Sequence, residues 1–525
     1  MKSLSRSFWF FALLILLVNL LQATHTELLK DEAYYWYYAK QLKWGYFDHP
    51  PFVALLASTS AFLGGEIGLR LGSVLLSIGA YLLVFFSLEK ETQQRHSTNF
   101  WLVLLSLPLV NLYGFLTLPD SGTLFFTALF IFSYKHFLKQ KKWSTLWLAV
   151  AMAGLMYSKY TGILIILAAL LSNLGLLKNR NAWIAVGLSL LFFSGHLWWL
   201  YENAFITLRF HFSERPNHAY SFGDFTGLFL LNAIALFGLF AYDIYRAVFR
   251  LKSTDTFKRG LVFMTLGVLV FFFWSSFEKK SQLQWLLPAC YPALVLFFEQ
   301  LDENKAVLKR LRAIALTSLL LLSTLRVFMS VAQWSPWHLE THNIQVWANE
   351  IERQVTTETV LFKDAYQKAA LYEFYTKKPA LSFNSLSYRP NAYDFDERWT
   401  LLHQQRLTIL SSSPKKNTSD IPDLNPKDGL TLNEIVNYTH FSARHFKRFN
   451  DLLELKLLEG VRAYAAILDE HKNAVALIPL KTDANGLLLT LNNQDPRIGK
   501  ALAIRIGVAY NNQPIQLISL SSFKP

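Results

Sequence analysis

The chain has 525 residues, of which 52% are hydrophobic and only 17% are charged, with 43 Phe, 23 Tyr and 15 Trp. Soluble proteins carry about 25% charged residues, so this composition excludes an ordinary soluble protein and predicts a polytopic membrane protein with a soluble part attached. The formal net charge is +14, but many basic residues lie in short loops between apolar runs, which argues against a nucleic-acid-binding face. Cys290 is the only cysteine, so no intrachain disulfide is possible.

A transmembrane helix needs about 20 mostly apolar residues, and fewer where neighbouring helices shield it. We therefore expect about eleven membrane-spanning segments, and the first should stay as a helix because no small-residue cleavage site follows it. In chain order they lie near residues 7–22, 71–88, 100–117, 122–138, 143–157, 160–177, 182–200, 224–246, 260–276, 283–299 and 311–331.

Lysine and arginine are concentrated in alternate loops, which predicts that those loops are cytoplasmic. They include Lys90, Arg95, Lys139, Lys141, Lys142, Lys178, Arg180, Arg250, Lys258, Lys305 and Arg310. The opposite loops, 23–70, 118–121, 158–159, 201–223 and 277–282, then face outward, and so does everything after about residue 335. We expect a multi-pass membrane protein with its chemistry on the outward, extracytoplasmic side.

The first outward loop holds a dense group of acids and aromatics, KDEAYYWYYAKQLKWGYFDHPPF over residues 30–52. Asp31, Glu32 and Asp48 lie beside a membrane, where a charge is costly unless it is solvated or functional. Two structural readings remain open. Asp31 and Glu32 also suit the N-terminus of a helix, and Asp48 and His49 also suit a turn.

Six basic residues in the outward loops oppose the topological bias and are candidates for binding an anion. They are Arg70, Lys159, Arg209, Arg215, Lys279 and Lys280. Asp120, in TLPDSG, lies in the same set of loops. Lys159 also suits a lysine that reaches toward lipid headgroups, and Asp120 also suits a helix cap.

Carboxylates and cations on one membrane face suit group transfer. A carboxylate accepts the proton of an attacking hydroxyl, and cations stabilise a departing phosphate. No P-loop or Gly-x-Gly-x-x-Gly pattern follows a strand. The sequence thus predicts transfer from a lipid phosphate to an outward-facing hydroxyl.

The composition changes near residue 335. We expect a transmembrane catalytic domain over 1–334 that includes the large outward loop 23–70. An outward α/β segment should follow over 335–410, then a linker over 411–429 and a β-rich module over 430–525.

The motifs together resemble those of the GT-C superfamily, the glycosyltransferases that use lipid phosphosugars. Within it they resemble the bacterial branch related to protein O-mannosyltransferases and the lipid A aminoarabinose transferase. The motifs that carry the resemblance are DEAYYWYYAKQL, GYFDHPPF, LPDSGTLFF and SKYTG, with QWLLPACYPAL and the stretch 364–395 further on. It covers roughly residues 1–400, and the last 125 or so residues match no family that we can name.

The resemblance implies a mostly α-helical GT-C membrane protein and an inverting displacement, with a polyprenyl-phosphate sugar as donor. The acceptor would be a glycolipid, polysaccharide or protein. Asp31 matches the catalytic aspartate, with Glu32 as the second choice of base, and Asp48 matches the acid of the second motif. His49 stands where relatives often have a lysine that contacts the lipid phosphate.

The remaining assignments also rest on the resemblance. Arg70, Lys159, Lys279 and Lys280 would supply further charge to the phosphate. Tyr34, Tyr35, Asp120 and Arg209 would line the substrate pocket. Asp48 and His49 would be the ligands of any divalent cation, but no His-x-x-x-His pair accompanies them.

Two other functions would fit parts of the pattern. One is a transporter or flippase of lipid-linked sugars, but transporters usually show repeats and broken helices at the middle of the membrane. The other is a ligase or polymerase of preassembled glycans, for which we expect a catalytic histidine or more outward arginines.

Overall fold

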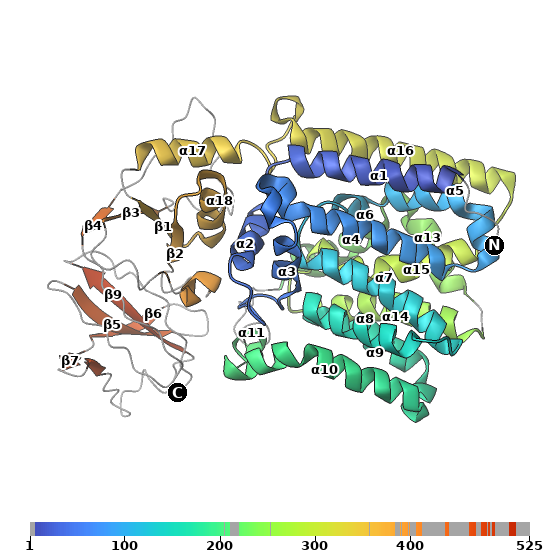
Figure 1. Ribbon diagram of the computed structural model, residues 1–525, viewed down its shortest axis with the longest axis horizontal. Helices are drawn as coiled ribbons and strands as arrows, with labels where there is room; N and C mark the ends of the chain where they lie inside the picture. Colours follow the sequence, from blue (N-terminus) through green and yellow to red (C-terminus); the bar gives the residue numbers. More distant parts are fainter. Residues whose placement is uncertain are drawn as a thin grey trace. The chain divides into compact units, whose positions relative to one another are not determined.

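The computed structural model describes residues 6–411, apart from 204, 210–219, 252–253, 356–357, 384–388, 390, 397 and 399–405. Beyond residue 411 it describes only the backbone of six strands. The chain divides into two compact units (Figure 1). We call them the helical unit, Met1–Thr26 with Ala39–His342, and the α/β unit, Glu27–Tyr38 with Asn343–Pro525.

The helical unit consists of helices joined by short connections, many of them single turns. Its longer helices are α1 (Arg6–His25), α4 (Gly65–Ser87), α5 (Lys90–Ser106), α7 (Pro119–Leu138), α8 (Ser144–Ser158), α10 (Arg180–Glu202), α14 (Thr256–Ser275) and α16 (Lys305–Ser330). Its shorter helices are α3 (Phe52–Ser58), α6 (Pro108–Leu112), α9 (Ile163–Ser172), α11 (Ile206–Arg209), α12 (Leu228–Phe237), α13 (Ala241–Arg250) and α15 (Cys290–Glu299). The short 3₁₀ helices are η1 (Ala61–Leu63), η2 (Tyr160–Gly162), η3 (Leu174–Lys178), η6 (Gly238–Phe240), η7 (Leu283–Ala289) and η8 (Ala332–Trp334). A π-helical segment, η5 (Gly223–Gly227), precedes α12.

Within the described residues, six helical segments have the length and apolar composition to cross a membrane unaided. They are α1, α4, α10, the broken run Gly223–Arg250, α14 and α16. The other five predicted spans fall on α5 with α6, on α7, on α8, on α9 and on η7 with α15. The prediction of a mostly α-helical membrane protein is confirmed.

Helix α7 is not among these six, because it contains polar residues, and its packing shows why they are tolerated. Most of its side chains are buried, including Thr123, Thr127 and Ser133. It packs against α4 and α8 (Figure 1). A helix surrounded by protein does not have to present apolar side chains to lipid, so polar residues are tolerated along it.

The two ends of the helical unit differ in the contacts that they carry. At one end the predicted cytoplasmic loops form ion pairs, such as Arg95–Glu303 at 2.6 Å and Lys139–Glu89 at 3.4 Å. At the other end the last turns of α1 and α16 are joined, since Gln22 donates to the hydroxyl of Ser330 at 2.9 Å. The starts of α4 and α7 and the end of α8 also lie at this second end (Figure 1).

The α/β unit is built on a four-stranded sheet in the order β2-β1-β3-β4. Strand β1 (Thr359–Lys363) pairs in parallel with β2 (Ala380–Phe383) and β3 (Arg406–Ser411), and β4 (Val436–Thr439) pairs antiparallel with β3. The helices of the unit are α2 (Lys30–Ala39), α17 (Ile344–Gln354), α18 (Tyr366–Thr376) and η9 (Ala392–Phe395).

Further strands follow in the region predicted to be β-rich. Strands β5 (Val461–Leu468), β6 (Ala474–Pro479) and β9 (Ala503–Tyr510) form an antiparallel sheet in the order β6-β5-β9. Strands β7 (Lys481–Asp483) and β8 (Gly486–Leu488) form a separate antiparallel pair. The predicted linker 411–429 lies outside the described residues beyond Ser411.

Residues 27–38 pack with the later part of the chain rather than with the loop in which the sequence places them. The carboxylate of Glu27 accepts the backbone N–H groups of Ile344 and Gln345 at 2.6 and 3.1 Å, which caps the start of α17. The backbone N–H of Leu28 donates to the hydroxyl of Tyr375 at 2.9 Å. These bonds explain why α2 belongs to the α/β unit.

Candidate functional site

Three of the motifs found in the sequence meet around one glycine of the helical unit. A Cβ atom built on Gly122 of α7 would lie 2.5 Å from the ring of Phe52 and 2.5 Å from the hydroxyl oxygen of Ser158. Only glycine leaves room for both neighbours. The segments 48–52, 118–122 and 158–162 are therefore in direct contact, although they are far apart in the sequence.

Asp120 and Lys159 form an ion pair at this junction. The Nζ of Lys159 donates to Oδ1 of Asp120 at 2.8 Å, and the two side chains are only 13% and 7% exposed. Asp120 lies in the first turn of α7, where the helix dipole favours an acid. The sequence predicts these residues separately, one for the substrate pocket and one for the phosphate, and the structure pairs them.

The loop that carries Asp48 is held against α10. The imidazole of His196 is fully buried, and its Nδ1 lies 2.7 Å from the carbonyl oxygen of Trp44. Its Nε2 lies 2.8 Å from the hydroxyl of Tyr160. Because a carbonyl can only accept, Nδ1 carries the proton and Nε2 accepts from Tyr160. His196 thus links the loop before Asp48 to the residue after Lys159.

Further contacts fix the same loop. A Cβ on Gly45 would lie 2.3 Å from the ring of Trp199, so a side chain there would separate the loop from α10. Thr207 donates to the carbonyl of Tyr46 at 3.2 Å, and the N–H of Tyr46 donates to the carbonyl of His49 at 3.2 Å. Burial raises the pKa of Tyr46 to about 12. Asp48, in the turn that these bonds form, is only 5% exposed.

Arg70 has a clear structural role. Its guanidinium is fully buried and donates to the carbonyl oxygens of Ala23 and Thr26 at 3.3 and 2.5 Å. A cation at the C-terminus of a helix is favoured by the helix dipole. Arg70 therefore caps the C-terminus of α1. It is the same side chain that the sequence suggests for binding the donor phosphate.

Arg326 of α16 is a residue that the sequence analysis did not select. It is 5% exposed and donates to the side-chain oxygens of Asn111 and Asn19 at 2.6 and 2.8 Å. Its guanidinium and that of Arg70 lie 5.2 and 5.6 Å from the ring of Phe115. The sequence could have indicated this residue, because Arg326 lies inside the predicted span 311–331 and an arginine inside a span is a functional candidate by default.

The other predicted cations lie elsewhere in the helical unit. Lys280 is exposed, 3.6 Å from Asp224 and 5.8 Å from the ring of Phe225. Lys279 follows α14 and is half-buried. Arg209 ends α11, and its side chain and the whole of Arg215 lie outside the described residues.

In the α/β unit the two acids at the start of α2 differ in their surroundings. Asp31 is exposed, and its Oδ1 accepts from the amide of Gln367 at 2.6 Å. Glu32 is fully buried and accepts the N–H of Leu29 at 3.2 Å, as an acid does when it caps its own helix. The hydroxyl of Tyr34 accepts the N–H of Ala392 at 2.7 Å, and Tyr35 is 5% exposed.

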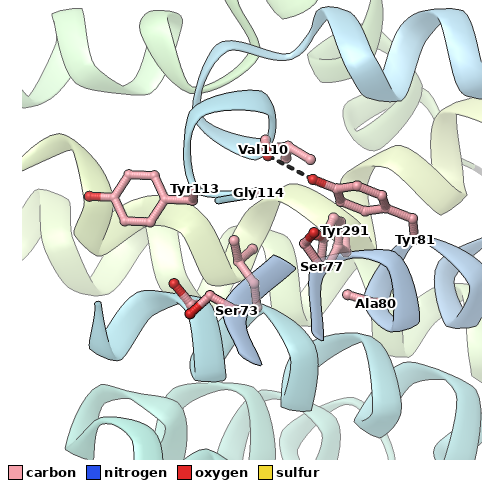
Figure 2. Close-up of a pocket in the computed structure, with 10 residues that line it drawn as sticks. Ser73, Ser77, Ala80, Tyr81, Val110, Tyr113, Gly114 and Tyr291 are labelled. Atoms are coloured by element: carbon pink, nitrogen blue, oxygen red, sulfur yellow. Dashed lines mark hydrogen bonds between the residues drawn. The ribbon is translucent and has the colours of Figure 1, made fainter. Parts of the chain in front are cut away.

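A small pocket lined by hydroxyl groups lies beside the start of α7 (Figure 2). Its lining comes from α4, α6 with the turn after it, α7 and α15. The hydroxyl of Tyr81 donates to the carbonyl of Val110 at 2.9 Å (Figure 2). Ser121, the neighbour of Asp120, lines the same pocket. Within the described residues, no group of three His, Cys, Asp or Glu side chains is placed to hold a metal ion.

Known proteins support the resemblance drawn from the motifs. Residues 48–199 match the family model of the dolichyl-phosphate-mannose-protein mannosyltransferases. This range contains Asp48, Asp120, Lys159 and His196. The chain is also 24% identical over 294 residues to the lipid A galacturonosyltransferase RgtD of Rhizobium johnstonii, across 53% of this chain and 62% of RgtD. The chain thus spans less than two thirds of the length of this relative.

The fold is that of ArnT from Cupriavidus metallidurans. The TM-score is 0.57 against both its apo structure and its complex with undecaprenyl phosphate, at 13% and 14% identity. The match covers 77% of this chain in each case and 92% and 94% of the two ArnT chains. These relatives are GT-C glycosyltransferases, and the predicted resemblance to that superfamily is confirmed.

Proposed function

We propose that this chain is a glycosyltransferase of the bacterial inner membrane that moves a sugar from a polyprenyl-phosphate donor to a hydroxyl on the periplasmic side. The observation that carries the proposal is the contact of three GT-C motifs around Gly122, within the segment that matches the mannosyltransferase model. The donor class is supported by ArnT, which was crystallised with undecaprenyl phosphate, and by a family named for dolichyl phosphate.

The proposed reaction is an inverting displacement. The acceptor hydroxyl gives its proton to Asp31 as its oxygen attacks the anomeric carbon. The bond between that carbon and the phosphate oxygen breaks, and its electron pair leaves with the polyprenyl phosphate. The exposure of Asp31 and the burial of Glu32 in a helix cap favour Asp31 as the base.

The remaining residues are proposed to act on the donor. Lys159, held by Asp120, would hydrogen-bond to the phosphate as its charge grows. His49 and Asp48 lie in the turn that His196 and Thr207 fix, and they would orient the sugar phosphate. Arg70, Lys279 and Lys280 would contribute to the positive potential, and Arg209 would contact the sugar. The ring of Tyr34 is only 2% exposed and packs on Tyr38 and Tyr366 instead.

A glycolipid is the acceptor class that we favour. RgtD, the relative that matches over 294 residues, acts on lipid A. The proposed orientation, with loops such as 139–142 in the cytoplasm, would give the enzyme access to glycolipids on the periplasmic side.

The test uses membranes that contain the full chain and a radiolabelled undecaprenyl-phosphate sugar. Wild type should release undecaprenyl phosphate and label a lipid product, whereas Asp31→Asn should reduce the rate by about a thousandfold. Asp302→Asn, in the loop before α16, is the matched control and should match wild type. A transporter would move the donor across the bilayer without consuming it, and intact donor with wild-type protein would refute the proposal.

A further inference from the structure

Arg326 carries a buried positive charge that no step of the proposed reaction uses. Its guanidinium donates to three neutral acceptors, which are the side-chain oxygens of Asn111 and Asn19, at 2.6 and 2.8 Å, and the backbone carbonyl of Asn111. Within the described residues its Nη1 atom has no hydrogen-bond partner. A charge that is removed from water in this way is costly, so its presence in a membrane-spanning helix indicates a function.

The bonds of Arg326 fix one end of the segment that joins α6 to α7. Asn111 lies in the last turn of α6, where backbone carbonyls have no partner within the helix. Asn19 of α1 extends the contact, because its amide donates to the carbonyl of Gly114 at 3.1 Å. A Cβ on Gly114 would lie 2.8 Å both from that amide and from the hydroxyl of Tyr81. This end of the segment is therefore held closely by α1, α4 and α16.

The other end of the same segment carries Asp120. The hydroxyl of Thr117 donates to the carbonyl of Leu69 on α4 at 2.9 Å. Ser121 donates to the carbonyl of Leu116 at 2.6 Å, which closes the first turn of α7 over the segment. Because non-helical backbone at membrane depth has to find its partners within the protein, these bonds and those of Arg326 together determine the path of residues 111–120.

We infer that Arg326 is a positioning residue for the transfer reaction. It fixes the segment 111–118, and through this segment it places the Asp120–Lys159 pair that acts on the donor phosphate. The inference rests on the proposed function. It depends on the shape of the side chain, because the planar fork of arginine binds Asn111 and Asn19 at the same time and a lysine ammonium group does not reproduce this geometry.

The experiment measures sugar transfer by Arg326→Gln and Arg326→Lys in the full chain, with radiolabelled undecaprenyl-phosphate sugar as donor. Both variants should lower kcat about tenfold or more, with KM for the donor changed less than about twofold. The effect falls on kcat because Lys159 is proposed to stabilise the phosphate as its charge grows in the transition state. Full activity of Arg326→Lys would show that only the charge matters, and it would overturn the inference.

Arg312→Gln is the matched control. Arg312 also lies on α16, and its Nε donates to the side-chain oxygen of Asn99 on α5 at 2.9 Å. Its loss removes the same kind of bond between α16 and a neighbouring helix, but not at the segment before Asp120. Arg312→Gln should lower the melting temperature and leave kcat within about twofold of wild type. A similar loss of kcat in both variants would assign Arg326 a merely structural role.

A double-mutant cycle tests whether Arg326 acts through the ion pair. In the Asp120→Asn background the pair is already lost, so Arg326→Gln should reduce kcat further by less than about twofold. An equal tenfold reduction in both backgrounds would show that the two residues act independently, and it would refute the positioning role.

The same cycle separates this inference from the proposed function. If wild type transfers no sugar at all, the proposed function fails, but thermal unfolding in detergent still measures the coupling. Asp120→Asn should then lower the melting temperature less in the Arg326→Gln background than in wild type, because the pair is no longer held in place. Equal shifts in the two backgrounds would contradict the inference.

Discussion

At the scale of single residues, the pair Asp120–Lys159 combines a structural and a chemical role. An ion pair that is almost completely removed from water gains little net free energy from its formation, but the loss of one partner leaves an uncompensated charge. The pair also fixes the ammonium group that we assign to the donor phosphate. Stability and transfer should therefore respond differently to single and double substitutions.

Asp120→Asn alone should lower the free energy of unfolding by about 3 kcal/mol, because Lys159 then stays buried without its partner. The double variant Asp120→Asn/Lys159→Gln should recover most of that loss but almost no sugar transfer. Thermal unfolding in detergent and the radiolabel assay measure the two quantities. Full recovery of transfer in the double variant would remove Lys159 from the mechanism.

The buried His196 makes a second prediction at this scale. His196→Ala removes the hydrogen bonds to the carbonyl of Trp44 and to the hydroxyl of Tyr160, which should cost about 2–4 kcal/mol of stability. Tyr160→Phe removes one of the two bonds and should cost about 1 kcal/mol. In the double variant the two costs should not add, because both substitutions remove the same hydrogen bond. Additive costs in a thermal unfolding cycle would show that the bond contributes nothing.

At the scale of elements, the close approach of α7, α8 and the Phe52 segment depends on one missing side chain. Gly122→Ala places a methyl group where Phe52 and Ser158 already lie. Overpacking of this kind costs about 1–3 kcal/mol, and it should also displace Asp120 and reduce transfer strongly. Gly187→Ala on α10 is the matched control, because no atom lies within 4 Å of the added Cβ. It should be neutral or slightly stabilising, and similar behaviour of the two variants would contradict the packing argument.

The stability of the α/β unit should depend on pH through the carboxylate of Asp396. Asp396 accepts from Arg398 at 2.7 Å and from the hydroxyl of Tyr37 at 2.7 Å. Burial would raise the pKa of Asp396, but the hydrogen bonds and charge of Arg398 outweigh it and lower that pKa below its usual value. The stabilisation is therefore present above about pH 4 and is lost as the pH falls through the lower folded value.

Limited proteolysis of the full chain between pH 3 and pH 6 can measure this effect. Cleavage in the α/β unit should increase as the pH falls below about 4. Asp396→Asn should show faster cleavage at pH 6 and a flatter pH dependence, because its amide does not titrate. An unchanged pH profile in this variant would exclude Asp396 as the group responsible.

Some of these elements can be predicted from the sequence and others cannot. The positions of the apolar helices follow from composition, because a segment exposed to lipid needs an apolar surface. The breaks in the run 223–250 and the shortness of α9 do not, since they depend on packing against neighbours. The meeting of Asp120 with Lys159 needed tertiary contacts, and His196 was missed because a lone histidine in an apolar run resembles many that have only a packing role.

At the scale of the whole molecule, the charge distribution makes a topological prediction. Alkaline phosphatase is active only outside the cytoplasm, so a fusion after residue 335 should be active and a fusion within 139–142 should be inactive. Lys139, Lys141 and Lys142 lie in the second predicted cytoplasmic loop. Their replacement by Gln should weaken the charge bias that sets the topology without abolishing sugar transfer. The opposite pattern of fusion activity would invert the proposed orientation.

The placement of residues 27–38 has a consequence for any attempt to divide the protein. The polypeptide passes from one unit to the other three times, after Thr26, after Tyr38 and after His342. A gene split at residue 342 would leave the second product without Glu27 over the first turn of α17 and without the aromatic rings of α2. The two halves should fold and function only when both are synthesised in the same cell. Neither half should remain folded when it is purified by itself.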